Sequence, residues 1–282
     1  MKVTVSKNSG YCSGVKKAIQ MLDDSVLMYG EGNPVFTMGE IIHNPKVIEN
    51  YKNKGVLAIS DIEKLNRNDN LVIRSHGVSP QIIEKLNVKG INIINATCPF
   101  VLKVQKLAGS LSRKGYFLIL IGNENHPEVK GIEGNISNQN YKIINSVKEA
   151  EKINSQKKIA VISQTTQTME NFILISKKII EKIKSEVLIL NTTCKATELR
   201  QKEAALLAKN VDIMIVAGGK NSANTNHIAD ISRNLLTDTY HIENAGELKM
   251  EWFKGKKSAG ICSGASTPIE DVENIKSIIE SI

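Results

Sequence analysis

The chain has 282 residues, 41% hydrophobic and 23% charged, with a net charge of +8, which is an ordinary composition for a globular protein. Its longest apolar run, residues 116–121, is too short to span a bilayer, and its first ten residues hold no apolar signal core, so we expect a cytoplasmic protein without a membrane partner. Aromatic residues are only 4% and do not interleave with basic runs, which argues against binding to single-stranded nucleic acid.

In chain order, the sequence predicts strands and helices that alternate around three similarly placed cysteines. The short runs VTV, INII and VLIL are rich in β-formers and end shortly before Cys12, Cys98 and Cys194. Apolar residues then recur at helical spacing over 15–26 and over 101–111. The stripe expected after the third cysteine is weaker and consists of Leu199, Leu206 and Leu207.

The segments between these cysteines also repeat. Each first helix leads to an apolar run, a glycine and a polar loop: MGEIIHNP (38–45), IGNENHPE (121–128) and AGGKNSAN (217–224). After an acidic helix start, a second apolar run ends in small polar residues: LVIRSHGVSP (71–80), IAVISQTTQT (159–168) and SAGICSGAST (258–267). The third copy lacks its last strand, and the strand before Cys12 could supply it.

Strand–helix alternation of this kind is typical of parallel sheets flanked by helices. We therefore predict an α/β protein of three small domains related by a pseudo-threefold axis. The domains are expected at 13–97, at 98–193 and at 194–282, the last completed by the strand within 1–12. Ligands of such sheets gather at the carboxyl ends of the strands, where all the polar loops fall.

The three repeated cysteines point to a metal centre. A cysteine at a helix N-terminus has a lowered pKa, and the resulting thiolate is a good metal ligand. Cys12, Cys98 and Cys194 would leave one metal position open, which suits zinc with a histidine or a [4Fe–4S] cluster with one exposed iron. The residue pattern leaves both open. Cys262 lies in a different slot of the repeat, so we predict that it packs near the site and is not a ligand.

Three of the five histidines occupy the recurring loops, namely His43, His76 and His126. The matching slots carry compact donors suited to phosphate oxygens: Thr165, Thr166, Ser222, Asn224 and Ser266. Glu128, two residues after His126, is the best-placed carboxylate to deliver a proton, and Glu40 in the first loop is its rival.

The motifs YCSGV (11–15), ATCP (96–99), GNENHPEVKG (122–131), SQTT (163–166), CKAT (194–197), NSANTN (221–226) and SGAS (263–266) resemble those of the 4-hydroxy-3-methylbut-2-enyl diphosphate reductase (IspH/LytB) family. The resemblance covers nearly the whole chain, in order. HPEVKG together with the three cysteine contexts is its most specific part.

This resemblance implies three domains around a central [4Fe–4S] cluster with an open apical iron and three ligands, Cys12, Cys98 and Cys194. It implies an oxidoreductase that removes the allylic hydroxyl of its substrate with two electrons and two protons. The products would be isopentenyl and dimethylallyl diphosphates, in the last step of the non-mevalonate isoprenoid pathway. Ferredoxin or flavodoxin would supply the electrons.

The resemblance also implies roles for the loop residues. The substrate would be held by His43, His76, His126, Thr165, Ser222, Asn224 and Ser266. Glu128 would donate protons, with Thr165 and His126 as its catalytic partners. The loop NSAN departs from the family's usual N-S-S-N, so Ala223 offers no hydroxyl.

Two other hypotheses for the function also fit the residues. One is a different three-cysteine cluster enzyme, a hydro-lyase or synthase of the quinolinate synthase kind. The other is a basic nucleic-acid-binding protein with a structural zinc, which the charge of +8 would suit.

Overall fold

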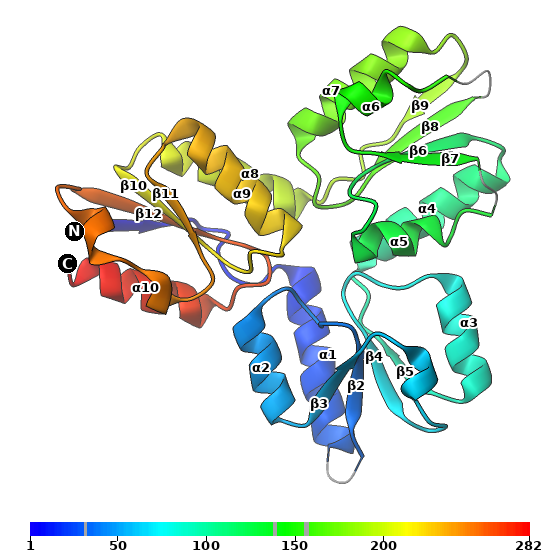
Figure 1. Ribbon diagram of the computed structural model, residues 1–282, viewed down its shortest axis with the longest axis horizontal. Helices are drawn as coiled ribbons and strands as arrows, with labels where there is room; N and C mark the ends of the chain where they lie inside the picture. Colours follow the sequence, from blue (N-terminus) through cyan, green and yellow to red (C-terminus); the bar gives the residue numbers. More distant parts are fainter. Residues whose placement is uncertain (31–32, 138–139, 155–157) are drawn as a thin grey trace. The chain divides into compact units, whose positions relative to one another are not determined.

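The computed structural model describes residues 1–30, 33–137, 140–154 and 158–282, and the chain forms two compact units (Figure 1). The first unit contains Met1–Lys16, Ile42–Asn53 and Lys195–Ile282, and the second contains Lys17–Ile41 and Lys54–Cys194. One parallel sheet of four strands lies in the first unit and two such sheets lie in the second. Within the described ranges, no helix combines the length and the apolar character needed to cross a membrane.

The sheet of the first unit has the strand order β11-β10-β12-β1, so the first strand of the chain pairs in parallel with the last. Its strands are β1 (Lys2–Val5), β10 (Ile213–Ala217), β11 (Thr239–Ile242) and β12 (Ser258–Ser263). The helices of this unit are α2 (Pro45–Asn53), α8 (Lys195–Ala208), α9 (Ala223–Leu235) and α10 (Ile269–Glu280), with 3₁₀ turns η2 (Ala245–Glu247) and η3 (Met250–Phe253). Apolar side chains of α10 cover one face of the sheet, and those of α8 and α9 cover the other (Figure 1).

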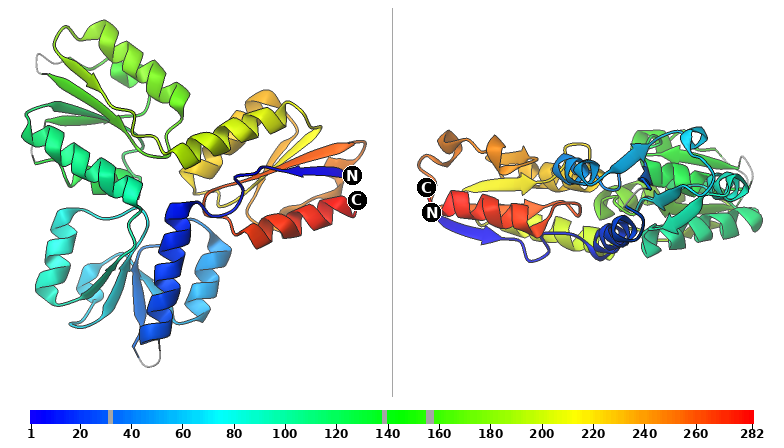
Figure 2. Two further views of the ribbon diagram at one scale, coloured as in Figure 1. Left: turned by 180° about the vertical axis from the view of Figure 1, so that it is seen from behind. Right: turned by 90° about the horizontal axis from the view of Figure 1, so that it is seen from below.

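The second unit begins with a sheet of strand order β3-β2-β4-β5. Its strands are β2 (Val35–Met38), β3 (Val56–Ile59), β4 (Asn70–Ile73) and β5 (Asn92–Asn95). Helix α3 (Pro80–Lys89) and the 3₁₀ turn η1 (Ile62–Lys64) cover one face, where Leu86 packs against Leu71 and Ile73. Helix α1 (Ser13–Tyr29) runs along the other face (Figure 2).

The other sheet of the second unit has the order β7-β6-β8-β9. Its strands are β6 (Phe117–Ile121), β7 (Tyr141–Ile144), β8 (Ile159–Ser163) and β9 (Val187–Ile189), and its helices are α4 (Pro99–Arg113), α5 (Pro127–Glu133), α6 (Val147–Ala150) and α7 (Met169–Lys182). The runs FLILI and IAVIS form its two central strands. Apart from Ser163 at the end of β8 they are apolar, because α4 and α5 cover one face of the sheet while α6 and α7 cover the other.

The three sheets repeat one design. In each, the strand before a cysteine is an edge strand that pairs only with the third strand of its repeat. The glycine after each first strand donates its N–H to the carbonyl that ends the neighbouring strand: Gly39 to Ile59 at 2.7 Å, Gly122 to Ile144 at 2.9 Å and Gly218 to Ile242 at 2.9 Å. The α/β fold of three similar domains predicted from the sequence is therefore confirmed.

The stripe predicted for the third cysteine's helix is wrong for Leu199 and Leu206, whereas Leu207 is partly buried against the apolar cluster of its sheet. Leu199 is 39% exposed and Leu206 is 64% exposed, whereas α8 buries a mostly polar face of Thr197, Arg200, Gln201, Ala204 and Ala208. The sequence pattern pointed to these leucines because they are the most apolar residues of this helix. The hydrogen-bonding partners of its polar side chains determine instead which face turns inward. The segments with acidic helix starts also form only single turns, η1, α6 and η2.

Candidate functional site

Three of the four cysteines occupy equivalent positions, and all four are thiols rather than halves of disulfides. Cys12, Cys98 and Cys194 are half-buried and lie between an edge strand and a helix. Their N–H groups donate to carbonyls that follow the adjacent strands: Cys12 to Ala265 at 3.2 Å, Cys98 to Ser75 at 3.0 Å and Cys194 to Thr165 at 2.8 Å. The same hydrogen bond thus holds each thiol at the carboxyl end of its own sheet.

The repeated phrase N-x-T-C forms a local turn. Asn95 Oδ1 accepts hydrogen bonds from the N–H of Thr97 at 3.1 Å and from its hydroxyl at 2.5 Å. Asn191 Oδ1 accepts the same pair from Thr193, at 3.0 and 2.7 Å. Asn side chains stabilise turns by bonding to the backbone two residues on. The phrase therefore occurs twice because it fixes the backbone directly before two of the three thiols.

Cys262 differs from the other three in its surroundings. It lies within strand β12, is fully buried, and packs in the apolar cluster under α8 and α9. Burial raises the pKa of its thiol to about 12, so the side chain is protonated at neutral pH. These surroundings favour packing over metal binding.

Glu128 is a buried carboxyl held by one residue. It lies in the first turn of α5 with 1% of its surface exposed. Thr165 donates its N–H to one carboxylate oxygen at 2.6 Å and its hydroxyl to the other at 2.9 Å. Burial raises the pKa of Glu128 to about 7, although both hydrogen bonds favour the ionised form. A carboxyl with such a pKa can both hold and release a proton near neutrality.

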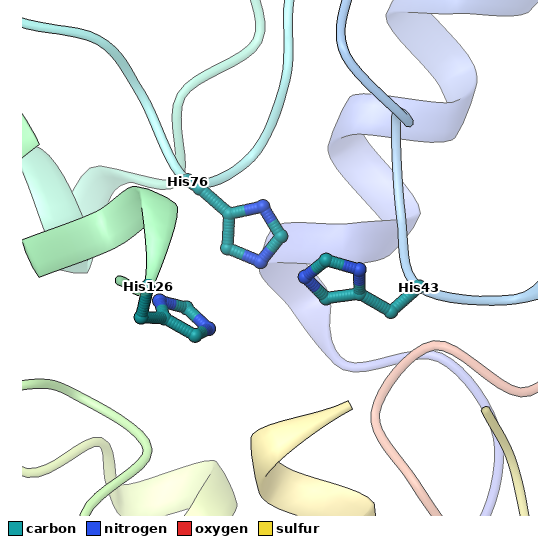
Figure 3. A group of neighbouring side chains, drawn as sticks. All are labelled: His43, His76 and His126. Atoms are coloured by element: carbon teal, nitrogen blue, oxygen red, sulfur yellow. The ribbon is translucent and has the colours of Figure 1, made fainter. Parts of the chain in front are cut away.

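His76 and His126 face each other within the second unit. Their rings meet edge to face with centroids 5.3 Å apart (Figure 3). His126 is also the N-cap of α5, and its Nδ1 accepts the N–H of Glu128 at 3.2 Å. That hydrogen bond leaves Nδ1 without a proton, so the neutral ring carries its proton on Nε2. His43, which Figure 3 also draws, belongs to the first unit.

The rival carboxylate has different neighbours. Glu40 lies with Arg74 in the lining of a cavity of about 610 Å³ at the carboxyl ends of β2 and β4. Burial lowers the pKa of the Arg74 guanidinium, and the Glu40 carboxylate partly opposes this change. Of the two candidates, Glu128 therefore has the surroundings of a proton donor, whereas Glu40 is the counter-charge of an arginine.

In the first unit, the loop before α9 carries two of the predicted donors. Ser222 is the N-cap of α9, and its hydroxyl accepts the N–H of Thr225 at 3.4 Å. Asn224 is 4% exposed, and neither its Oδ1 nor its Nδ2 has a hydrogen-bond partner among the described residues. A buried carboxamide without partners costs stability, so its presence indicates a ligand or water that this side chain meets.

His43 and Ser266 lie together in the same unit. The Ser266 hydroxyl donates to the carbonyl of His43 at 3.1 Å. Asn44 ties these two segments, since its Nδ2 donates to the carbonyl of Ser266 at 3.2 Å and its Oδ1 accepts the N–H of Val47 at the start of α2. Sequence reasoning missed Asn44, although an asparagine directly before a proline and a helix is a recognisable cap.

Sequence reasoning also missed two close approaches made by glycines. A Cβ on Gly219 would lie 2.5 Å from the carbonyl oxygen of His43, so only glycine allows the loop before α9 to approach that histidine. The hydroxyl of Thr225 is buried and has no hydrogen-bond partner in the described part of the chain, and a Cβ on Gly264 would lie 2.0 Å from it. These approaches join segments distant in sequence, so no local pattern could have indicated them.

The fold and these side chains define a class of protein. Thiols, imidazoles and a buried carboxyl that titrates near neutrality lie on loops after parallel strands, where α/β enzymes carry out their chemistry. A structural or purely nucleic-acid-binding protein has no need of a carboxyl in this state. The chain is an α/β enzyme.

Comparison with known proteins identifies the family. The model of the family described as "LytB protein" matches residues 3–280. The 4-hydroxy-3-methylbut-2-enyl diphosphate reductase of Aquifex aeolicus is 41% identical, over 99% of this chain and 96% of that protein. The protein of the same name from Caldanaerobacter subterraneus subsp. tengcongensis is 42% identical, over 99% and 98%.

Two solved structures agree. A structure of (E)-4-hydroxy-3-methyl-but-2-enyl diphosphate reductase, described as the terminal enzyme of the non-mevalonate pathway, is 41% identical with a TM-score of 0.71 and full coverage of both chains. That of the E-1-hydroxy-2-methyl-but-2-enyl-4-diphosphate reductase of Plasmodium falciparum is 26% identical with a TM-score of 0.93, covering 98% of this chain and 87% of that one. The chain belongs to the LytB family, and the resemblance found in its motifs is confirmed.

Proposed function

We propose that this protein is the oxidoreductase that converts 4-hydroxy-3-methylbut-2-enyl diphosphate into isopentenyl and dimethylallyl diphosphates, the last step of the non-mevalonate pathway. Similarity to reductases of that name over the whole chain supports it. The observation that carries it is Glu128, a fully buried carboxyl with a pKa of about 7 held by both donors of Thr165. The match of the LytB family model to residues 3–280 argues against both the hydro-lyase and the zinc-protein alternatives.

Cys12, Cys98 and Cys194 are proposed as the three ligands of a [4Fe–4S] cluster with an open apical iron. Their donor set fits this group, because all three are half-buried thiols after an edge strand and before a helix. The N–H of Val15 donates to the Cys12 sulfur at 3.4 Å, so this sulfur lies at the N-terminal end of α1. When bound, the cluster supplies the electrons and a Lewis-acidic iron.

The diphosphate is proposed to bind through His43, His76, Ser222, Asn224 and Ser266. Asn224 gives the strongest support, because its buried carboxamide has two donors and an acceptor unused by the described residues. The unused N–H donors of Asn224 and the N-terminal amides of α9 are suited to phosphate oxygens. The loop NSAN loses one hydroxyl at Ala223 but keeps that residue's N–H.

Glu128 is proposed as the proton donor, with Thr165 and His126 beside it. The two hydrogen bonds from Thr165 fix the orientation of the carboxyl, and Glu128 in turn donates its N–H to His126. Thr165 also accepts the N–H of Cys194, so one residue orients both the acid and a thiol-bearing segment. Thr165 and His126 would thereby position the proton and the substrate hydroxyl.

The remaining proposals concern partners and organisation. Electrons would come from ferredoxin or flavodoxin, and the enzyme would work in the cytoplasm without nucleic acid or membrane. The three domains are proposed at 13–97, 98–193 and 194–282, with strand β1 completing the last; its pairing with β12 supports that completion.

The deciding experiment is anaerobic turnover of the allylic diphosphate with a chemical reductant, with both products measured. We expect a brown, iron-containing protein that forms both diphosphates. A colourless protein that retains no iron under anaerobic preparation, or an iron-loaded protein without turnover, would show that the proposed function is wrong.

A further inference from the structure

The three segments that lead from an edge strand to a cysteine are not built alike. Residues 96–97 and 190–193 form two of them, and in both an Asn–Thr turn fixes the backbone before the thiol. Residues 6–11 form the third, which is longer and reads SKNSGY. Asn8 makes no such turn, because the N–H two residues on, that of Gly10, donates to the Ser263 hydroxyl at 2.9 Å, while Asn8 Nδ2 donates at 2.6 Å to Glu203. Something other than a local turn must hold Cys12.

Glu203, on α8, accepts hydrogen bonds from the donors of this longer segment. Its carboxylate accepts the N–H of Asn8 at 3.0 Å, the Nδ2 of Asn8 at 2.6 Å and the hydroxyl of Ser6. Burial alone would raise the pKa of Glu203, but these hydrogen bonds outweigh it and hold the pKa below its ordinary value. The side chain is therefore ionised at neutral pH, and its hydrogen bonds are charge-assisted.

Arg200, one helical turn earlier on α8, holds the other end of the segment. Its Nη2 donates to the carbonyl of Gly10 at 2.9 Å, and its Nη1 donates to the carbonyl of Ala196 at 3.1 Å. Gly10 has a φ of +92°, and its N–H donates to the Ser263 hydroxyl at 2.9 Å. The carbonyl of Gly10 is thus directed at a buried guanidinium two residues before the thiol.

We propose that Arg200 and Glu203 are positioning residues for Cys12, and that the inward polar face of α8 replaces in the first repeat the Asn–Thr turn of the other two. The inference rests on the proposal that Cys12 is a cluster ligand. It accounts for a helix that buries an arginine while Leu199 and Leu206 are exposed. Helix α8 begins directly after Cys194, so one helix connects the supports of two thiol-bearing segments.

The test exchanges the hydrogen-bonding groups of Glu203 and Asn8. Glu203→Gln places a carboxamide against the donors of Asn8, and Asn8→Asp places a carboxylate against Glu203; each change removes a charge-assisted pair. The double variant Glu203→Gln with Asn8→Asp restores donor to acceptor with the roles reversed. Glu149→Gln is the matched control, since Glu149 likewise accepts a backbone N–H, that of Asn145, and a serine hydroxyl, that of Ser146, on α6, which carries no cysteine.

Two measurements on the full-length protein read the position of Cys12. The first is the rate of iron loss from the anaerobic holoprotein to a chelator. The second is the alkylation rate of each cysteine in the metal-free chain, resolved by peptide mass spectrometry with Cys98 as internal reference. Glu203→Gln and Asn8→Asp should each speed alkylation of Cys12 about tenfold relative to Cys98, because local opening follows the loss of such hydrogen bonds. The double variant should recover most of this change, and Glu149→Gln should show none.

The outcomes separate the inference from the function. An unchanged ratio of Cys12 to Cys98 labelling in Glu203→Gln, or equal acceleration at every cysteine, would overturn the positioning role. Failure of the double variant to recover would do the same. If instead Cys12→Ser keeps its full iron content, the proposed cluster ligand is wrong, while the labelling ratios still decide whether α8 holds the segment.

Discussion

Replacing Glu128 with Gln tests the proton donor with little change of shape. The carboxamide keeps one oxygen that can accept the N–H of Thr165, now found at 2.6 Å. The Thr165 hydroxyl, now a donor at 2.9 Å, can rotate to accept a hydrogen bond from the new NH₂ group. The variant should therefore fold and retain iron, but it lacks the acidic carboxyl proton that Glu128 could donate. We expect turnover to fall about 100- to 10,000-fold, the range typical of a removed general acid.

The same substitution has a stability signature with a defined sign. Burial raises the pKa of Glu128 from 4.5 to about 7, which at about 1.4 kcal/mol per pH unit corresponds to about 3 kcal/mol. Because the pKa is raised, this stability is fully present below pH 4.5 and is lost as the pH rises through about 7. Denaturant unfolding of the metal-free wild-type protein should thus lose about 3 kcal/mol more than Glu128→Gln between acid pH and pH 8.

Kinetic pH profiles supply the refutation. If the protonated carboxyl is the donor, kcat/KM of the wild-type enzyme falls above pH about 7. Thr165→Val removes a hydroxyl that stabilises the carboxylate, so the pKa rises and the falling limb moves to higher pH. A limb that moves to lower pH, or Glu128→Gln with iron intact and turnover within threefold of wild type, would refute this reasoning.

Four further substitutions probe the other parts of the site. Cys98→Ser should lose most cluster iron under anaerobic preparation, whereas Cys262→Ser should keep it; the reverse result would invalidate the ligand assignment. Asn224→Ala should raise KM about tenfold or more but leave Tm equal or higher, because it removes a buried carboxamide without partners, and a lowered Tm with normal KM would contradict this. Gly219→Ala should raise KM through displacement of His43, whose carbonyl would lie 2.5 Å from the added Cβ, and an unchanged KM would show that the loop is not held there.

The sequence predicted much of the fold because the repeats are local. Each strand before a cysteine was visible as a β-rich run, and the central strands were visible as unbroken apolar runs such as FLILI. The inward face of α8 was predicted wrongly because hydrogen-bond partners within the first ten residues of the sequence determine which of its side chains turn inward. Amphipathic patterns report burial of apolar groups and are silent on buried polar partners.

For the site, residue types were easier to predict than contacts. The motif HPE indicated a histidine and a carboxylate in one loop, and the structure shows how His126 caps the helix that begins at the next residue. The sequence favoured Glu128 over Glu40 by its place in the loop, but it could not show the contacts that distinguish them, Thr165 in one case and Arg74 in the other. Both partners come from strands distant in the chain.

The pairing of β1 with β12 bears on the order in which the protein becomes complete during synthesis. Lys2–Val5 pair with residues 258–261, which the ribosome adds 256 residues later (258 − 2). At ordinary elongation rates of about 5–20 residues per second, the first strand waits roughly 13 to 50 s for its partner. Throughout that interval the carbonyl of Ala265 that holds the N–H of Cys12 does not yet exist. The first unit can therefore form only after residues 258–265 have been synthesised, so a cluster held by Cys12 is expected to be inserted no earlier than that.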